Sequence, residues 1–213
     1  MGSLKLAVVP VTPFEQNCAL IWDDETMRGV VVDPGGDVDR IKDGISQTGI
    51  TVERILITHG HIDHVGGAMD LKEALGVDII GPHVADEELC GGIEAQAQMF
   101  GVGEGYRNLV PDRWLEEGDT VEIGGHGFNV LHCPGHAPGH VIFFSQEHRF
   151  AHVGDVLFRG SIGRTDLPGG DHETLIASIK NKVLPLGDDV NFFCGHGPGG
   201  TIGEERTSNP FLL

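Results

Sequence analysis

The sequence predicts an α/β protein of four layers, in which two β-sheets pack face to face and helices cover their outer faces. Three observations predict this α+β arrangement. Short apolar or β-branched runs alternate with segments of helical periodicity. Both halves of the chain repeat that order, and 213 residues can bury a substantial core. We therefore expect residues 1–213 to form a single domain.

The first half begins with three expected strands, which are short apolar runs separated by turn sequences such as Pro34-Gly35-Gly36. A helix is expected next, because Val38 and Ile41 lie at helical spacing and Gly49 provides a stop. The remaining segments follow from the same two periodicities. The expected strands are residues 4–9, 18–22, 29–32, 54–58 and 77–80, and the expected helices are residues 37–47, 64–75 and 85–100.

The second half repeats this order, with apolar alternation first and helical periodicity afterwards. Its expected strands are residues 120–123, 128–132, 141–145, 150–153 and 190–194, and its expected helix is residues 171–183. Two β-rich halves that each continue into helices are typical of two sheets with helices outside.

Composition excludes several classes of function. Lys and Arg number 14 against 32 Asp and Glu, a formal net charge of −18, which disfavours a nucleic-acid or an anionic-membrane partner. No apolar run approaches the ~18 to 20 residues of a transmembrane helix, and no leader precedes the first strand. Cys18, Cys90, Cys133 and Cys194 form no close pair, so we expect buried, free thiols and a cytoplasmic protein.

The densest group of candidate ligands is Thr58-His59-Gly60-His61-Ile62-Asp63-His64, which lies between an expected strand and an expected helix. Side chains two apart in an extended segment face the same way, so His59, His61 and Asp63 converge. The turn into the helix then redirects His64. Imidazole and carboxylate are ligands that zinc and iron prefer, and the cluster therefore predicts a metal site.

Three further residues of ligand type each follow the end of an expected strand: His136, Asp155 and His196. Taken alone, each would be a turn residue. Loops at one edge of a rigid sheet scaffold are a usual place for binding residues, and strands in register bring their ends to one edge. Together with the cluster at 59–64, these residues complete two coordination sets.

These motifs, in this order, resemble those of the metallo-β-lactamase superfamily. Within it the chain is similar to the glyoxalase II (hydroxyacylglutathione hydrolase) group, especially its short single-domain bacterial form. The resemblance implies an αββα sandwich. It is carried by His-x-His-x-Asp-His at 59–64, Cys133-Pro134-Gly135-His136, Gly154-Asp155, Gly163-Arg164-Thr165-Asp166 and Gly195-His196-Gly197.

The resemblance also implies roles for these residues. One metal would be held by His59, His61 and His136, and a second by Asp63, His64 and His196. Asp155 and a hydroxide would bridge the two metals, and Asp63 would also orient the nucleophile, so that Asp63 and Asp155 are the expected catalytic residues. The cofactors are two divalent cations, with zinc favoured and iron or manganese also compatible with the ligand types.

Three other residues have two interpretations each. Arg164 is expected to bind a substrate carboxylate, or alternatively to form an ion pair with Asp166 that fixes its loop. His140 and Asp33 are expected either to orient a metal ligand by hydrogen bonding or to make purely structural hydrogen bonds. The other six histidines, which include His126 and His148, are assigned to turns, surface and core.

The resemblance implies hydrolysis of a small thioester linked to glutathione, such as S-D-lactoylglutathione, to a hydroxy acid and a free thiol. Two departures bear on the glutathione part. The chain ends at Leu213 without the C-terminal helical domain of the long glyoxalase II enzymes, and Pro198 stands where they carry a tyrosine. The alternatives are a single-iron persulfide dioxygenase and a hydrolase of other small esters or lactones. A binding protein without catalysis is disfavoured because every ligand position is filled.

Overall fold

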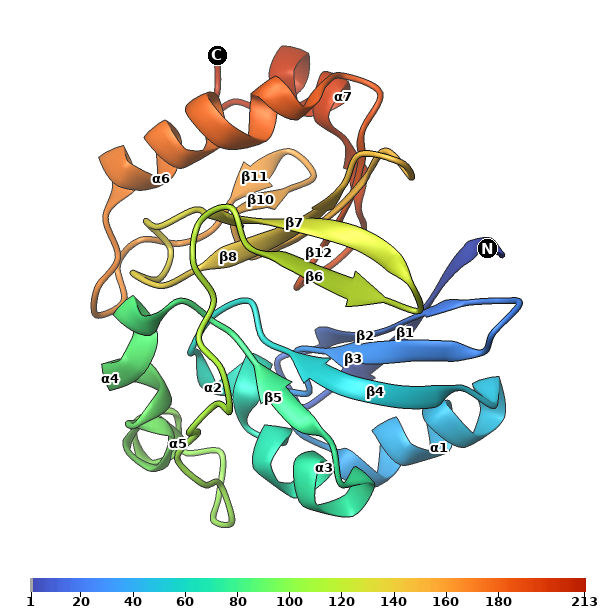
Figure 1. Cartoon of the computed structure of the whole chain (residues 1–213). Coiled ribbons are helices and arrows are strands. Elements are labelled where there is room, and N and C mark those ends of the chain that lie inside the picture. Colours follow the sequence, from blue (N-terminus) through green and yellow to red (C-terminus); the bar gives the residue numbers. More distant parts are fainter. Residues whose placement is uncertain (1) are drawn as a thin grey trace.

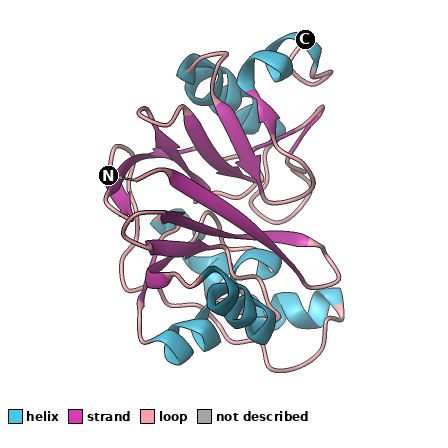
Figure 2. Ribbon diagram, turned by 90° about the vertical axis from the view of Figure 1, so that its right-hand side faces the viewer, coloured by secondary structure: helices cyan, strands magenta, loops and turns pink. Residues whose placement is uncertain are grey.

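Two β-sheets lie face to face at the centre of the fold, and helices cover the outer face of each (Figure 1). The structure is a computed structural model that describes residues 2–213. A second view, turned by 90°, shows the same succession of helices, strands, strands and helices (Figure 2). The four-layer αββα arrangement expected from the sequence is confirmed.

The first sheet has the order β1-β2-β3-β4-β5 and is antiparallel up to β3 and parallel from β3 to β5. Its strands are β1 (Leu4–Val11), β2 (Gln16–Asp23), β3 (Arg28–Val32), β4 (Thr51–Leu56) and β5 (Asp78–Ile80). The helical segments of this half are α1 (Val38–Thr48), α2 (Ile62–Val65), α3 (Ala68–Leu75), η1 (Val84–Asp86), α4 (Glu87–Cys90) and α5 (Ile93–Phe100).

The second sheet has the order β13-β12-β9-β8-β7-β6, with only the β12–β9 pair parallel. Its strands are β6 (Thr120–Ile123), β7 (His126–His132), β8 (Val141–Ser145), β9 (Phe150–Gly154), β12 (Asn191–Cys194) and β13 (Gly200–Thr201). A separate hairpin joins β10 (Leu157–Phe158) to β11 (Ser161–Ile162). The helical segments are α6 (His172–Ser178), η2 (Ile179–Val183), η3 (Leu184–Leu186) and α7 (Ile202–Ser208).

Three apolar layers hold the four structural layers together. Between the sheets, Ile21 and Val30 of the first sheet pack with Phe128 and Phe143 of the second, and all four are fully buried. Each such side chain contributes roughly 1.5–3 kcal/mol by leaving water. The other two layers lie between each sheet and its own helices. Buried and exposed residues alternate along β6 and β7, and this alternation in the sequence indicates that one face of each strand packs between the sheets.

Two helices expected to be continuous are interrupted at pairs of glycines. The expected helix 64–75 divides into α2 and α3 at Gly66-Gly67, because the turn at residues 34–36 packs directly against that backbone. Gly67 N–H donates to Pro34 O at 2.9 Å, and a Cβ on Gly66 would lie 2.7 Å from Gly35 O. The expected helix 85–100 begins as η1, which adjoins α4, and is interrupted at Gly91-Gly92 before α5. These two expectations of single helices were wrong.

The C-terminal part of the chain adds elements that the sequence analysis did not predict, namely β10, β11, β13, η3 and α7. Each is short, and short elements carry little periodicity. Across residues 2–213, no helix is both long enough and apolar enough to cross a membrane. All four cysteines are buried and unpaired, as expected. Burial raises the pKa of the Cys133 and Cys194 thiols to about 12, so they remain protonated and unreactive.

Candidate metal centre

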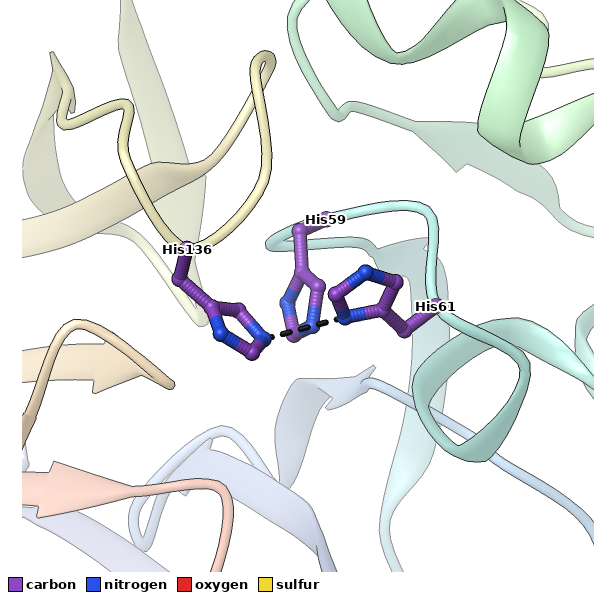
Figure 3. Close-up of side chains that lie close together, drawn as sticks. All are labelled: His59, His61 and His136. Carbon is purple, nitrogen blue, oxygen red and sulfur yellow. Dashed lines mark hydrogen bonds between the residues drawn. The ribbon is translucent and has the colours of Figure 1, made fainter. Parts of the chain in front are cut away.

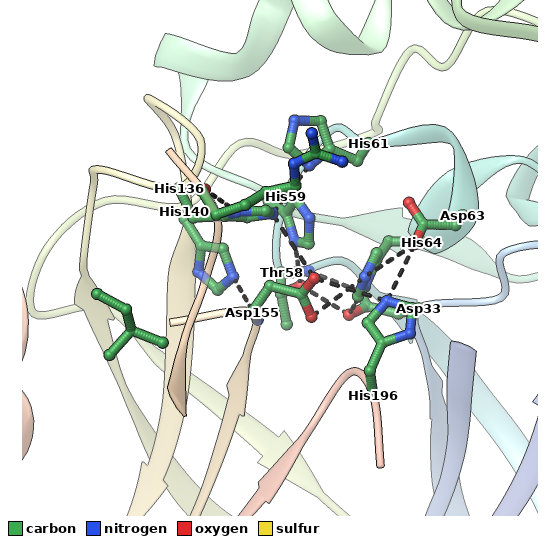
Figure 4. Close-up of polar contacts among 12 residues, drawn as sticks. Asp33, Thr58, His59, His61, Asp63, His64, His136, His140, Asp155 and His196 are labelled. Carbon is green, nitrogen blue, oxygen red and sulfur yellow. Dashed lines mark hydrogen bonds and ion pairs between the residues drawn. The ribbon is translucent and has the colours of Figure 1, made fainter. Parts of the chain in front are cut away.

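All seven side chains expected as metal ligands meet at one edge of the sandwich (Figure 4). The reason lies in where the strands end. β4 leads into the segment 59–64, and β7, β9 and β12 stop a few residues before His136, Asp155 and His196. The adjacent ends of these strands therefore place four loops around one pocket.

Three of the ligand candidates form a first group, His59, His61 and His136 (Figure 3). One nitrogen from each lies within 4.8 Å of the others, and all three side chains are buried. His61 Nδ1 and His136 Nε2 face each other at 3.0 Å. Burial lowers the pKa of His59 and His136 and brings that of His61 to about 3. The three imidazoles are thus neutral, which is the form that binds metals.

A second group consists of Asp63, His64 and His196, whose ligand atoms also lie within 4.8 Å of one another. His196 Nε2 is 3.0 Å from Asp63 Oδ2, and His64 Nε2 is 3.7 Å from the same oxygen. Burial alone would lower the pKa of His64, but the Asp155 and Asp63 carboxylates raise it well above its ordinary value. A concentration of negative charge therefore surrounds this nitrogen.

Asp155 lies between the two groups. Its Oδ1 is 3.4 Å from His64 Nε2, and its Oδ2 is 3.6 Å from both His136 Nε2 and His196 Nε2. Although burial opposes ionisation, His64 lowers the pKa of Asp155, so the carboxylate is charged. Its oxygens thus reach histidines of both groups.

The residues present fit a metal centre. Buried polar atoms nearly always have a hydrogen-bond partner, yet His59 Nε2, His64 Nε2 and Asp155 Oδ1 have none within the described residues. No Lys or Arg is among the buried residues described, and Arg164, the one cationic side chain of this kind at the cavity, is paired with Asp166. Neutral imidazoles and carboxylates that converge with unused lone pairs are a ligand set for divalent cations.

A relay of hydrogen bonds orients two of the ligand candidates (Figure 4). Thr58 Oγ1 donates to Asp33 Oδ2 at 2.6 Å and so accepts from His59 Nδ1 at 2.9 Å. The same Asp33 oxygen accepts from His64 Nδ1 at 2.9 Å. In the neutral form that binds a metal, both rings therefore carry their proton on Nδ1 and direct an unprotonated Nε2 into the centre. Of the two interpretations of Asp33, the geometry matches the one in which it orients a ligand candidate.

Thr58 was missed by the sequence analysis as a functional residue. Its role depends on the parallel pairing of β3 with β4, which sets Val32 opposite Leu56 and so brings Asp33 beside Thr58. Thr58 N–H also donates to Asp33 Oδ1 at 2.8 Å. A polar residue directly before a histidine cluster is the only local signal that could have identified it.

His140 and Arg164 reach the centre through the backbone. His140 Nε2 accepts the Asp155 N–H at 3.0 Å, and its ring stacks on that of His59 with 4.5 Å between centroids. His136 Nδ1 donates to the backbone oxygen of Arg164 at 2.7 Å. The Arg164 guanidinium makes two 2.7 Å hydrogen bonds to Asp166, which is the loop-fixing ion pair, although the side chain still lines the cavity.

A second structural carboxylate, Asp86 in η1, was also missed. Its Oδ2 accepts Gly60 N–H at 2.8 Å and its Oδ1 accepts Gly139 N–H, so it joins the loop of the first histidines to the loop that precedes His140. Burial raises the pKa of Asp86 to about 6. No local pattern marks this residue, because its partners lie 26 and 53 positions away.

The loop that carries His196 is fastened by the start of β2. Asn17 N–H donates to Gly195 O at 2.8 Å, and the Asn17 side-chain amide donates to Cys194 O and Gly197 O at 3.0 and 2.9 Å. The last ligand candidate of the second half is thus held by a strand of the first half.

A cavity of about 280 Å³ opens onto these groups. His61, Asp63, His136, Asp155 and His196 form its polar floor. Its other walls are mainly apolar, since they are formed by Phe14, Ile62, Phe100, Phe158 and Leu167, together with Arg164. A small organic molecule therefore fits beside the candidate ligands.

Comparison with known proteins is consistent with this geometry. The sequence model of the metallo-β-lactamase superfamily matches residues 11–196. The hydroxyacylglutathione hydrolase GloC of Haemophilus influenzae is 48% identical over 210 residues, covering 98% of each chain. The crystal structure of TTHA1623 in a di-iron-bound form is 40% identical with a TM-score of 0.86, and covers 97% of this chain and 100% of its own.

The B3 metallo-β-lactamase BLEG-1 is also similar in structure. It is 35% identical, has a TM-score of 0.88, and the match covers 99% of both chains. A match of the superfamily model over most of the chain, with relatives this similar along their whole length, identifies the family. The chain belongs to the metallo-β-lactamase superfamily.

Proposed function

We propose that this protein hydrolyses a small thioester, as a metal-dependent hydrolase of the glyoxalase II type. The observation that carries the proposal is the convergence of five imidazoles and two carboxylates, with unused lone pairs, beside a cavity that holds a small organic molecule. The near full-length relative named hydroxyacylglutathione hydrolase supports a thioester such as S-D-lactoylglutathione as the substrate.

Two divalent cations are proposed to bind. His59, His61 and His136 would hold one, Asp63, His64 and His196 the other, and Asp155 would contact both. When bound, such a pair lowers the pKa of water towards neutrality and polarises a carbonyl oxygen. Zinc is our first choice of metal, while iron and manganese suit the same ligand types, and the di-iron form of a 40% identical neighbour supports iron as well.

The side chains of this protein would do three things in the reaction. Asp33 and Thr58 keep the ligand histidines in one tautomer. Asp63 Oδ2, which is hydrogen-bonded to His196, orients the attacking water and takes up its proton. The apolar wall of Phe14, Phe100 and Phe158 excludes bulk water from the acyl group. Water would add to the carbonyl carbon and give one proton to Asp63, the C–S bond would break, and the departing thiolate would take that proton to leave as a thiol.

The thiol-bearing part of the substrate is proposed to extend towards Arg164. Arg164 is the only Lys or Arg side chain that lines the described cavity. A substrate carboxylate would compete with Asp166, since both bind the guanidinium through paired hydrogen bonds. Arg164 is thus our candidate for substrate binding.

Two assays and a metal analysis test the proposed function. The purified protein is expected to contain close to two metal ions per chain and to release thiol from S-D-lactoylglutathione. Oxygen uptake on glutathione persulfide is measured in parallel, because a single-iron persulfide dioxygenase would consume oxygen there. One iron per chain with oxygen uptake and no thiol release would contradict the proposal.

A variant of the central carboxylate tests the assignment of the ligands. Asp155→Asn should lose bound metal and reduce thiol release by about 10²-fold or more, because it removes charge between two cations. Asp43→Asn, an exposed carboxylate on α1, is the matched control and should behave like the wild type. Full metal content and activity in Asp155→Asn would refute the bridging role.

A further inference from the structure

A second cluster of metal-type side chains lies outside the candidate metal centre. It consists of His126, Glu147 and His148, whose ligand atoms lie within 4.8 Å of one another. His126 is the first residue of β7, and the other two residues lie in the turn between β8 and β9. From the sequence, both histidines were expected at structural positions, because no spacing along the chain links them.

The two imidazoles face each other with their nitrogens. His126 Nδ1 is 2.9 Å from His148 Nε2, and the rings are 4.5 Å apart between centroids at an angle of 77°. His61 Nδ1 and His136 Nε2 of the candidate centre are placed in the same manner, at 3.0 Å and 90°. Convergent nitrogens of this kind are suited to share one cation.

A buried carboxylate stands behind His126. Asp23 Oδ2 accepts from His126 Nε2 at 2.9 Å, and both side chains are at most 1% exposed. The proton of His126 is therefore held on Nε2, which leaves the Nδ1 lone pair directed at His148. A carboxylate that fixes a ligating histidine from behind is the usual support of a metal site, and Asp33 stands behind His64 in the same way.

Asp23 is itself well fixed. Thr26 N–H donates to its Oδ1 at 2.7 Å, and this bond is the main reason that the pKa of Asp23 lies far below its ordinary value. Asp23 Oδ1 also accepts the Thr26 hydroxyl at 2.8 Å. The support for His126 is thus a carboxylate whose charged form is favoured by its hydrogen bonds.

The cluster is remote from the candidate metal centre. β2 begins at Gln16, which pairs with His196, and ends at Asp23. Seven steps of about 3.3 Å along a strand separate these ends by about 23 Å. The two sets of side chains share no residue, so each can bind metal without the other.

We propose that His126 Nδ1, His148 Nε2 and a Glu147 carboxylate oxygen form a separate site for one divalent transition-metal ion, with zinc the best match to two imidazoles and one carboxylate. Binding moves the His148 proton to Nδ1, so that no proton is released. His148 is partly exposed and Glu147 exposed, which leaves the remaining coordination positions to water. The ion joins the β8–β9 turn to β7, and through Asp23 to the other sheet.

Zinc titration of the metal-free full chain tests this site. Bound zinc is counted by mass spectrometry after desalting, and affinity is measured by competition with a chromogenic chelator. His148→Ala should bind one zinc fewer than the wild type, and Glu147→Gln should bind that zinc at least tenfold more weakly. Both residues lie at the surface end of the cluster, so these variants should fold.

Two controls make the count specific. His172→Ala removes an exposed histidine on α6 that belongs to neither cluster and should bind as much zinc as the wild type. Asp155→Asn should still bind the zinc that His148→Ala loses, because the sites are independent. Equal zinc binding by His148→Ala and the wild type, or an equal loss in His172→Ala, would overturn the proposal whatever the fate of the proposed hydrolase activity.

Discussion

At the scale of single residues, Thr58 is a neutral side chain that orients a ligand candidate of the metal centre proposed above. Its hydroxyl lies between Asp33 and His59, so its one proton and its lone pairs decide which nitrogen of His59 is free. Without that hydroxyl, His59 Nδ1 loses its acceptor and Asp33 loses one of its donors. The ring is then free to adopt the other tautomer or to rotate.

Thr58→Ala should therefore weaken metal binding by about 10–100-fold, the usual effect of losing a group that supports a metal ligand. Thr58→Ser keeps the hydroxyl and should stay within a fewfold of the wild type. Chelator competition measures both affinities. Equal affinities for the alanine and serine variants would show that the hydroxyl has no part in orienting His59.

At the scale of elements, the turn between β12 and the loop of His196 must contain a residue without a side chain. A Cβ on Gly195 would lie 2.1 Å from Asp155 Oδ1 and 2.5 Å from His64 Cε1. Those two groups contact each other across the middle of the centre, at 3.4 Å. The glycine thus lets a backbone segment that follows β12 of the second sheet approach His64, a ligand candidate that follows β4 of the first sheet.

Gly195→Ala should displace Asp155 or His64, reduce bound metal, and lower the free energy of unfolding by about 1–3 kcal/mol, the range for overpacking a buried site. Metal analysis and thermal unfolding measure the two effects. Gly127→Ala on β7 is the matched control, because its Cβ would meet no atom within 4 Å. Normal metal content in Gly195→Ala would mean that the loop moves without disturbing the centre.

The elements also show why part of the site was predictable and part was not. The strands and the ligand candidates at their ends follow from local signals, because a histidine cluster after an apolar run is visible in a short window. Thr58 and Asp86 act through partners brought close by sheet pairing and loop packing, which no local window contains. The breaks at Gly66-Gly67 arise similarly, from the approach of the turn at residues 34–36.

At the scale of the whole molecule, a buried histidine between the sheets makes stability depend on pH. His152 of β9 is fully buried, lies beside Phe193, and neither ring nitrogen has a hydrogen-bond partner within residues 2–213. Burial, which outweighs the nearby Asp33, lowers its pKa to about 4 from the ordinary value of 6.5. The unfolded chain therefore binds a proton more readily than the folded protein.

The contribution of His152 to the free energy of unfolding is fully present above pH 6.5. It is lost as the pH falls towards 4, because the unfolded chain gains a proton there and the folded protein does not. At pH 5 the loss is about 2 kcal/mol. His152→Leu removes the titrating group. The free energy of unfolding of this variant minus that of the wild type should therefore be about 2 kcal/mol larger at pH 5 than at pH 8. Denaturant unfolding with excess chelator measures this without a contribution from bound metal.

The exposed His172→Leu serves as the control for that comparison and should leave the difference between pH 8 and pH 5 near the wild-type value. The prediction fails if His152→Leu and the wild type lose stability in parallel over this range. Such a result would mean that water reaches His152 and hydrates its charged form.

The hydrogen bonds from the Asn17 side chain to the backbone around His196 can form only after the two halves of the chain have docked. Each half of the polypeptide carries only part of the proposed coordination sphere: His59 to His64 come from one half, and His136, Asp155 and His196 from the other. If these residues bind two ions as proposed, neither half can hold both before the halves dock, and tight binding of both ions is expected only late in folding. Ions held by ligands from both halves would then stabilise the docked arrangement over the separated halves.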